Sequence, residues 1–314
     1  AISALKAMET ASKKELKIGT ASIYRCAYRA LQAFSGKDTL SFNLITPTFL
    51  KEFESWMLQP RKKGNNKTVK ANSKSTVSIY VRALRAAWNR SNPQGVKYPF
   101  GKRSASLYTI PKTRNIKKAL SQADISKIAS YTPIDGSMEH RSRDLWLFSY
   151  LANGMNFKDV ALLRWRNIEG DHIRLVRAKT KNTTEEETTI TVIVTRQIGR
   201  ILDRWSVKPV EPDGYIFPIL HPGMTAEQQH KAVYQMIKNT NKYMKRICEV
   251  LELPPVTTYH ARHSFATVLK RSGASIEFIS ESLGHRSIGT TMAYLDSFES
   301  DQKKIGRASC RERV

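Results

Sequence analysis

The chain has 314 residues, of which 40% are hydrophobic, and it carries a formal net charge of +25. This length suggests two domains, and no stretch approaches the roughly eighteen apolar residues that a membrane-spanning helix needs. The three cysteines, Cys26, Cys248 and Cys310, are far apart and lack metal-ligand spacing. This pattern favours a reducing, intracellular setting without structural zinc.

The positive charge is concentrated in the first part of the chain. Residues 1–118 contain 24 Lys and Arg against 5 Asp and Glu, whereas residues 119–314 contain 28 against 22. Lysines and arginines beside phosphates release condensed counterions, so a polyanion is the natural partner of such a segment. The charge favours a nucleic acid without distinguishing DNA from RNA.

Residues 12–108 have a helical pattern. Apolar residues at spacings of three and four predict helices over Thr20–Phe34, Thr46–Leu58 and Ser75–Ser91, with Pro47 at a first helical position. Residues 60–74 read as a basic loop rich in Gly and Asn. We therefore predict an all-helical basic domain over residues 1–110, in which the arginines of the third helix either face solvent or contact phosphates.

A linker is predicted over residues 111–120 and a second domain over residues 121–314. Ser121 and Asp124 have the spacing of a capping box at the start of a helix. Residues 172–194 alternate and are rich in Ile, Val and Thr, which predicts a β-hairpin or short sheet. Further helices are predicted over Arg143–Asn153, Arg196–Trp205, Ala226–Leu251, His263–Ser272 and Ile276–Leu283. The predicted fold class is mainly α with a small antiparallel β-sheet (α+β).

The most specific chemical pattern lies in residues 257–296. Arg262 opens a predicted helix, the tripeptide Leu283–His285 follows about twenty residues later, and Tyr294 comes nine residues after His285. Phosphodiester cleavage without a metal needs a nucleophile, positive charge at the non-bridging oxygens and a proton donor to the leaving oxygen. A tyrosine on a helix face is by itself usually structural, and only the upstream Leu-Gly-His makes Tyr294 a candidate nucleophile.

This stretch resembles the C-terminal signature of tyrosine recombinases of the phage integrase type. The similarity is closest to integrases of mobile elements from Bacteroidetes-type bacteria. Residues 119–125 match the start of the catalytic domain, and the first half matches the helical core-binding domain. The resemblance implies site-specific DNA cutting and rejoining through a 3′-phosphotyrosine intermediate, without metal, cofactor or ATP.

The resemblance also implies roles for individual residues. Tyr294 would be the nucleophile, Arg262 would bind the scissile phosphate, and His285 would hydrogen-bond a non-bridging oxygen. Lys179 matches the mobile lysine that protonates the 5′ oxygen, although Lys181 is close enough to compete. We expect DNA contacts from Lys62, Lys63, Lys67, Arg82, Arg85 and Arg286.

Two positions depart from the family pattern. The histidine expected three residues before Arg262 is replaced by Tyr259, with His260 next to it; the spacing favours Tyr259 and the chemistry favours His260. The first arginine of the family falls on Asn156, which has no charge. The charges that could compensate nearby are Arg141, Arg143, Lys158, Arg164 and Arg166.

The expected partner is double-stranded DNA, bound by a homo-tetramer that forms from monomers, in the cytoplasm of a bacterium. Two alternatives remain open at this point. One is a DNA-binding protein of recombinase fold that has lost cleavage, which Asn156 supports. The other is an RNA-binding helical protein, which explains only the charge.

Overall fold

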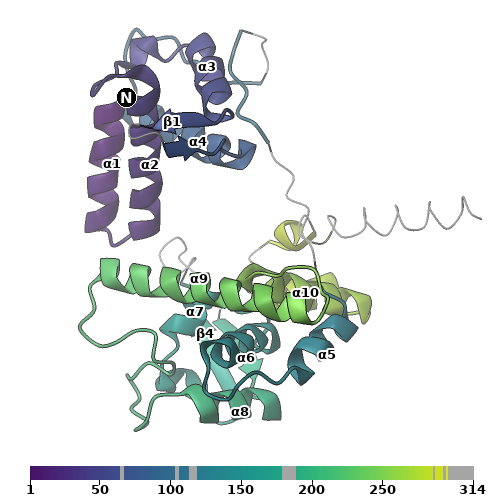
Figure 1. Cartoon of the computed structure of the whole chain (residues 1–314). Coiled ribbons are helices and arrows are strands. Elements are labelled where there is room, and N and C mark those ends of the chain that lie inside the picture. Colours follow the sequence, from purple (N-terminus) through teal and green to yellow (C-terminus); the bar gives the residue numbers. More distant parts are fainter. Residues whose placement is uncertain are drawn as a thin grey trace, which may run out of the picture. The chain divides into compact units, whose positions relative to one another are not determined.

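A computed structural model of the chain describes residues 1–63, 67–102, 106–112, 119–178, 189–285, 287–292 and 295, with Lys62, Lys63 and Lys67 described by their backbone only. The chain divides into two compact units, Ala1–Asn115 and Ile116–Val314 (Figure 1). The division falls within residues 111–120, for which the sequence predicts a linker.

The first unit is built on four helices. They are α1 (Ile2–Lys14), α2 (Ile18–Ser35), α3 (Pro47–Met57) and α4 (Lys74–Ser91). Helices α1 and α2 lie side by side (Figure 1). The prediction that helical structure starts near residue 12 was wrong, because Ile2, Leu5 and Met8 already bury one face of α1 at a spacing of three.

The three helices predicted in this unit are confirmed as α2, α3 and α4. Helix α3 begins as predicted, with Pro47 in its first turn and the Thr46 hydroxyl accepting a hydrogen bond from the Phe49 amide. The unit has one core, whose largest fully buried side chains are Ile2, Leu5, Leu31, Ile45, Leu50, Phe53, Met57 and Leu84.

The basic segment between α3 and α4 is not the loop that the sequence predicts. Strands β1 (Arg61–Lys63) and β2 (Lys67–Val69) pair antiparallel, with Arg61 opposite Val69 and Lys63 opposite Lys67. β-branched Thr68 and Val69 favour extended backbone, while the high charge conceals any apolar alternation. Within its described residues, the first unit is therefore helical apart from this hairpin and an isolated bridge between Phe100 and Tyr108.

The second unit combines helices with one small sheet. Its strands β3 (Ile168–Glu169), β4 (His172–Val176) and β5 (Thr189–Ile193) form an antiparallel sheet in that order, which confirms the predicted strand segment. The helices are α5 (Gln122–Ser130), α6 (Met138–Leu151), α7 (Phe157–Leu162), α8 (Arg196–Trp205), α9 (Ala226–Val250), α10 (Thr258–Arg271) and α11 (Ile276–Ser282). The predicted class, mainly α with a small antiparallel sheet, is confirmed.

Helix α6 is the centre of this unit and packs against α8, α9 and α10. Trp146 and Phe148 are fully buried in it. It begins five residues before the predicted Arg143, because the Ser137 hydroxyl caps it at the His140 amide. It ends at Leu151, before Asn153 and Gly154, whose φ angles of 54° and 64° cannot continue a right-handed helix.

Candidate active site

Helix α10 carries Arg262 into the interior of the second unit. The helix starts at Thr258, not at the predicted His263, so Arg262 lies in its second turn. The Arg262 side chain is 4% exposed and donates to the carbonyl oxygens of Gly154 (3.1 Å) and Leu283 (2.5 Å). Carbonyl oxygens are neutral acceptors, so these hydrogen bonds hold the buried guanidinium without neutralising its positive charge. An anion can therefore still pair with that charge.

His285 contacts the same guanidinium. Its Nε2 lies 3.2 Å from Arg262 Nη2, and its Nδ1 lies 2.9 Å from the Thr291 hydroxyl. Arginine has no acceptor, so Nε2 accepts this hydrogen bond and Nδ1 carries the proton that is donated to Thr291. The structure thus brings together the predicted pair of Arg262 and His285.

The segment between α6 and α7 approaches α10 very closely. A Cβ at Gly154 would lie 2.7 Å from the Arg262 Cα, and the φ of +64° at Gly154 is one that L residues rarely adopt. Asn156 follows as the N-cap residue of α7. Glycine is therefore required at residue 154 for Asn156 to lie beside Arg262.

Asn156 and Arg262 line one pocket of about 370 Å³. The other lining residues are Met155, Phe157, Lys158, Asp159, Ile237, Thr258 and Tyr259. Residues from α7, α9 and α10 thus line one pocket together with Arg262, which the sequence predicts to bind a phosphate. The uncharged Asn156 side chain belongs to the lining of this pocket.

Tyr259 and His260 have different surroundings. Tyr259 is 51% exposed, lines the pocket and stands edge-on to the His263 ring, with the ring centroids 4.4 Å apart. His260 Nδ1 accepts a hydrogen bond from the Thr257 amide at 3.0 Å and so caps α10. The geometry favours Tyr259 over His260 as the residue facing a substrate.

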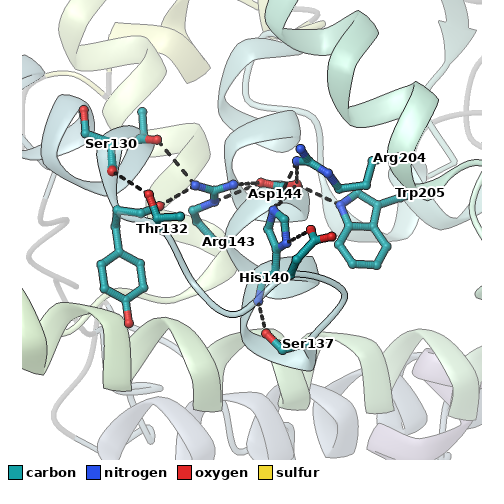
Figure 2. A network of polar contacts seen from close by, with 11 residues as sticks. Ser130, Thr132, Ser137, His140, Arg143, Asp144, Arg204 and Trp205 are labelled. Atoms are coloured by element: carbon teal, nitrogen blue, oxygen red, sulfur yellow. Dashed lines mark hydrogen bonds and ion pairs between the residues drawn. The ribbon is translucent and has the colours of Figure 1, made fainter.

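Arg143 does not supply the missing charge, because it belongs to a different polar network (Figure 2). Its Nε and Nη2 donate to Asp144 Oδ1 at 2.9 and 2.6 Å, and its Nη1 donates to the Tyr131 carbonyl. Arg204 and Trp205 of α8 donate to the other oxygen of Asp144. This buried carboxylate ties α6 to α8.

The other predicted compensating arginines also lie elsewhere in the described part of the chain. Arg141 donates to the Pro218 carbonyl at 3.2 Å and lines a separate pocket between α6 and α9. Arg164 stacks on Tyr215, 4.5 Å from the ring centroid. Arg166 pairs with Asp213 at 2.6 Å. Of the five candidates, only the exposed Lys158 lines the pocket of Arg262.

The structure brings forward a residue that the sequence reasoning missed. Arg177, directly after β4, is 8% exposed and donates to the Gly284 carbonyl at 3.1 Å and the Leu283 carbonyl at 3.4 Å. The Leu283 carbonyl also accepts from Arg262, so the two guanidiniums meet at one turn. The strand alternation contained the signal, because Arg177 follows Ile173 and Leu175 on the buried face.

Asp159 completes this buried group. Its Oδ1 accepts the Ala178 amide at 2.9 Å, directly before Lys179 in the chain. Burial raises the pKa of Asp159, and the Ala178 amide, Arg177 and Arg262 oppose the rise. The carboxylate therefore lies in the electrostatic field of both arginines and attaches the end of β4 to α7.

Several predicted residues lie outside the described residues: Tyr294, Lys179, Lys181 and Arg286, together with the side chains of Lys62, Lys63 and Lys67. Arg82 and Arg85 lie on the exposed face of α4 in the first unit. Arg82 Nε and Nη2 donate to the buried Ser78 hydroxyl at 3.1 and 2.6 Å, which fixes the guanidinium against the helix. This geometry leaves one edge of Arg82 facing outward.

The described residues contain no cluster of His, Cys, Asp and Glu that could hold a metal ion. None of their helices is both long and apolar enough to span a membrane.

Comparisons with known proteins identify the family of the chain. Residues 118–301 match the model of the phage integrase family, and residues 3–97 match a phage integrase SAM-like domain. The first match covers more than half of the chain, and the chain belongs to the phage integrase family.

Individual relatives match over shorter segments. The chain is 46% identical over 56 residues to the tyrosine recombinase XerC of Rhodospirillum centenum, which is 18% of this chain and 16% of that protein. It is 50% identical over 57 residues to an integrase/recombinase of Escherichia coli, which is 18% of this chain and 15% of that protein. The chain thus matches about a sixth of the length of these relatives.

Two solved structures resemble the whole chain. The Tn1549 transposon integrase in complex with transposon right end DNA has a TM-score of 0.61 at 17% identity, covering 97% of this chain and 99% of that one. The XerH site-specific recombinase bound to a difH substrate has a TM-score of 0.59 at 16% identity, covering 96% and 84%. These likenesses show that the chain has the recombinase fold.

Proposed function

We propose that this chain is a site-specific DNA recombinase, the integrase of a mobile element, that cuts and rejoins duplex DNA through a phosphotyrosine. The observation that carries the proposal is the convergence of Arg262, Arg177 and His285 at the Leu283–Gly284 turn. Positive and hydrogen-bonding groups fixed before the reaction stabilise the charge that develops on a phosphorus under attack.

In the proposed reaction, the Tyr294 hydroxyl oxygen attacks the scissile phosphorus, and the bond from phosphorus to the 5′ oxygen breaks. Lys179 gives the 5′ oxygen its proton, while Tyr259 relays the proton of the phenol to water. The phosphotyrosine conserves the energy of the broken bond. A 5′-hydroxyl can therefore attack it in reverse and rejoin the strand without ATP.

Arg177 takes the part of the missing first arginine in this proposal. Asn156 carries no charge, and loss of one phosphate-binding cation can cost on the order of 10² to 10³ in rate. Arg177 and Arg262 are both buried and both donate to the Leu283 carbonyl oxygen, so together they offer two positive charges to one phosphate. His285, whose Nε2 contacts the Arg262 guanidinium, would hydrogen-bond a non-bridging oxygen of the same phosphate.

The proposed DNA-contacting residues lie in both units. In the first unit they are Arg82, Arg85, Lys62, Lys63 and Lys67, and in the second unit Arg286. Helix α9 adds a basic face that the sequence reasoning did not single out, because Lys231, Lys238, Lys242 and Lys245 are exposed at spacings of seven, four and three. The same helix lines the pocket of Arg262 through Ile237.

The structural relatives support duplex DNA as the substrate, since the Tn1549 integrase and XerH were solved on DNA. We propose that this chain acts as a tetramer on DNA, assembles from monomers, and works in a bacterial cytoplasm. Size-exclusion chromatography with light scattering, with and without a nicked duplex, tests the assembly. A tetramer in the absence of DNA would contradict it.

A suicide duplex, nicked next to the cleavage position, tests the activity. The wild type should form a covalent protein–DNA adduct that resists denaturation, and Tyr294→Phe should form none. Arg177→Ala should lower adduct formation on the order of 10²-fold or more, and so should Arg262→Ala. Arg174, exposed on β4, provides the matched control, and Arg174→Ala should leave the adduct yield unchanged.

Asn156 keeps a second candidate function in view, a DNA-binding protein of recombinase fold without cleavage. The suicide duplex separates the two functions. Tight binding of the nicked duplex without any covalent adduct, with the nicked strand covered by the protein, would favour the DNA-binding protein without cleavage.

A further inference from the structure

Arg61 attaches the hairpin of β1 and β2 to the rest of its unit. The Arg61 guanidinium lies 4.0 Å from the centroid of the Trp56 ring, and its Nη1 donates to the Trp56 carbonyl at 3.0 Å. Its Nη2 donates to Asn72 Oδ1 at 2.7 Å, from the chain just after β2. Arg61 therefore connects the end of α3 to both ends of the hairpin.

The aromatic ring under the Arg61 guanidinium is well packed. Trp56 packs against Phe34 and Phe53, at centroid distances of 5.5 and 6.1 Å, and Phe53 is fully buried. The Asn72 amide donates to the Met57 carbonyl at 2.9 Å. Two strands of three residues are marginal by themselves in water, so this attachment determines where the hairpin lies.

The sequence around the hairpin is strongly basic. No Asp or Glu occurs between Glu54 and Asp124, a stretch that includes the whole hairpin. The register pairs Lys63 with Lys67, and like charges on directly paired residues destabilise a ladder. A basic segment of this kind favours an anion that comes from outside the chain.

Arg61 itself is a poor candidate for binding that anion. One face of its guanidinium covers the Trp56 ring and two of its nitrogens donate to Trp56 and Asn72. A phosphate would have to replace these contacts. The arginine is also half-buried, in contrast to Lys70 after β2.

We propose that the hairpin of β1 and β2 is an arm that contacts the DNA backbone, and that Arg61 is its positioning residue rather than a phosphate ligand. This inference rests on the proposed duplex substrate. In this arrangement, Arg61 directs the contacts of Lys62, Lys63 and Lys67, so its loss removes more than one phosphate contact.

The salt dependence of binding distinguishes these roles. Each phosphate contact contributes about 0.9 to the slope of log K against log salt concentration. The assay is fluorescence anisotropy of a labelled duplex of arbitrary sequence, at about 50 to 200 mM salt. Removing the three lysines together, by Lys62→Gln, Lys63→Gln and Lys67→Gln, should lower the slope by up to about 2.7.

Three single variants carry the decisive comparison. Arg61→Gln should lower the slope by about 1.8 or more, beyond the ~0.9 of one lost contact, and should have no further effect in the triple lysine variant. Arg61→Lys should behave like Arg61→Gln, because an ammonium group cannot reach both Trp56 and Asn72. Asn72→Ala should lower the slope by about 0.9 or more, although it removes no charge.

Several outcomes would overturn the inference. A slope change of about 0.9 for Arg61→Gln in both backgrounds, with Arg61→Lys like wild type, would make Arg61 a direct phosphate ligand. An unchanged slope for the triple lysine variant or for Asn72→Ala would also refute the arm. The unfolding midpoint of each variant checks that the first unit stays folded. If a variant is unfolded, the salt slope of Asn72→Ser is measured in its place.

The outcome for the proposed function is read separately. Salt slopes report binding only, whereas the suicide duplex reports the covalent step. A wild type that gives no adduct but shows the predicted slopes would refute the recombinase activity and leave the arm standing.

Discussion

The close approach of Gly154 to Arg262 gives the sharpest test of the site geometry. In Gly154→Ala, the added Cβ would lie 2.7 Å from the Arg262 Cα, whereas ordinary contacts begin at 3.4 Å. The two segments must therefore separate by at least 0.7 Å to reach that distance, because the nearest atom, the Arg262 Cα, belongs to the backbone. The separation moves Arg262, which we propose binds the scissile phosphate.

Gly170 provides a matched control for this substitution. Its φ of +60° is close to the +64° of Gly154, but nothing lies within 4 Å of a Cβ at Gly170. Both substitutions pay about 1–2 kcal/mol for an L residue in the left-handed region. Only Gly154→Ala adds overpacking, at about 1–3 kcal/mol.

The assays are urea unfolding and adduct formation on the suicide duplex. Gly154→Ala should lower the free energy of unfolding by about 2–5 kcal/mol, and Gly170→Ala by about 1–2 kcal/mol. A misplacement of about 1 Å in an active site can cost on the order of 10² in rate, so adduct formation should fall for Gly154→Ala and stay unchanged for Gly170→Ala. Equal effects of the two substitutions on adduct rate would refute the reasoning.

Three further predictions concern the second unit. Arg177→Lys should slow adduct formation about 10-fold or more because an ammonium cannot reproduce the fork at Leu283 and Gly284, and a wild-type single-turnover rate would contradict this. Burial raises the pKa of Asp159 above its unfolded value, so its contribution to stability is fully present below the unfolded pKa and is lost as the pH rises through the folded pKa. The stability of wild type relative to Asp159→Asn should therefore fall in urea titrations as the pH rises above the ordinary range of an aspartate, and a rising difference would reverse the sign. Asp144→Asn leaves the half-buried Arg143 without its carboxylate and should cost about 3–5 kcal/mol in urea unfolding, with a loss below about 1 kcal/mol as the refuting result.

Local patterns in the sequence predicted much of the fold. The capping box of Ser121 and Asp124 is present in the structure, and α8 has the predicted bounds. These features depend on neighbours a few residues apart, which a sequence displays directly. The start of α10 was misplaced because Thr258 and His260 in its first turn are polar and give no apolar period.

The candidate site was predicted only in part. The spacing of Arg262 and His285 indicated that both belong to one site, and the structure joins them at 3.2 Å. Arg177 escaped notice because its partners, the carbonyls of Leu283 and Gly284, lie more than a hundred residues further along the chain. The compensating charge was expected from residues that lie near Asn156 in the sequence. One of these residues, Arg143, forms an ion pair with the buried Asp144 instead.

The sequence alone determined that this chain is basic in its first part, helical in most of it, and equipped with the motif of a phage integrase. Hydrophobic period, capping residues and charge act over short distances, so they can be read in order along the chain. The tertiary structure alone decided which arginines meet at the Leu283–Gly284 turn. A buried arginine is stabilised by carbonyl oxygens wherever the fold brings them, and no spacing between Arg177 and Gly284 could show that these two would touch.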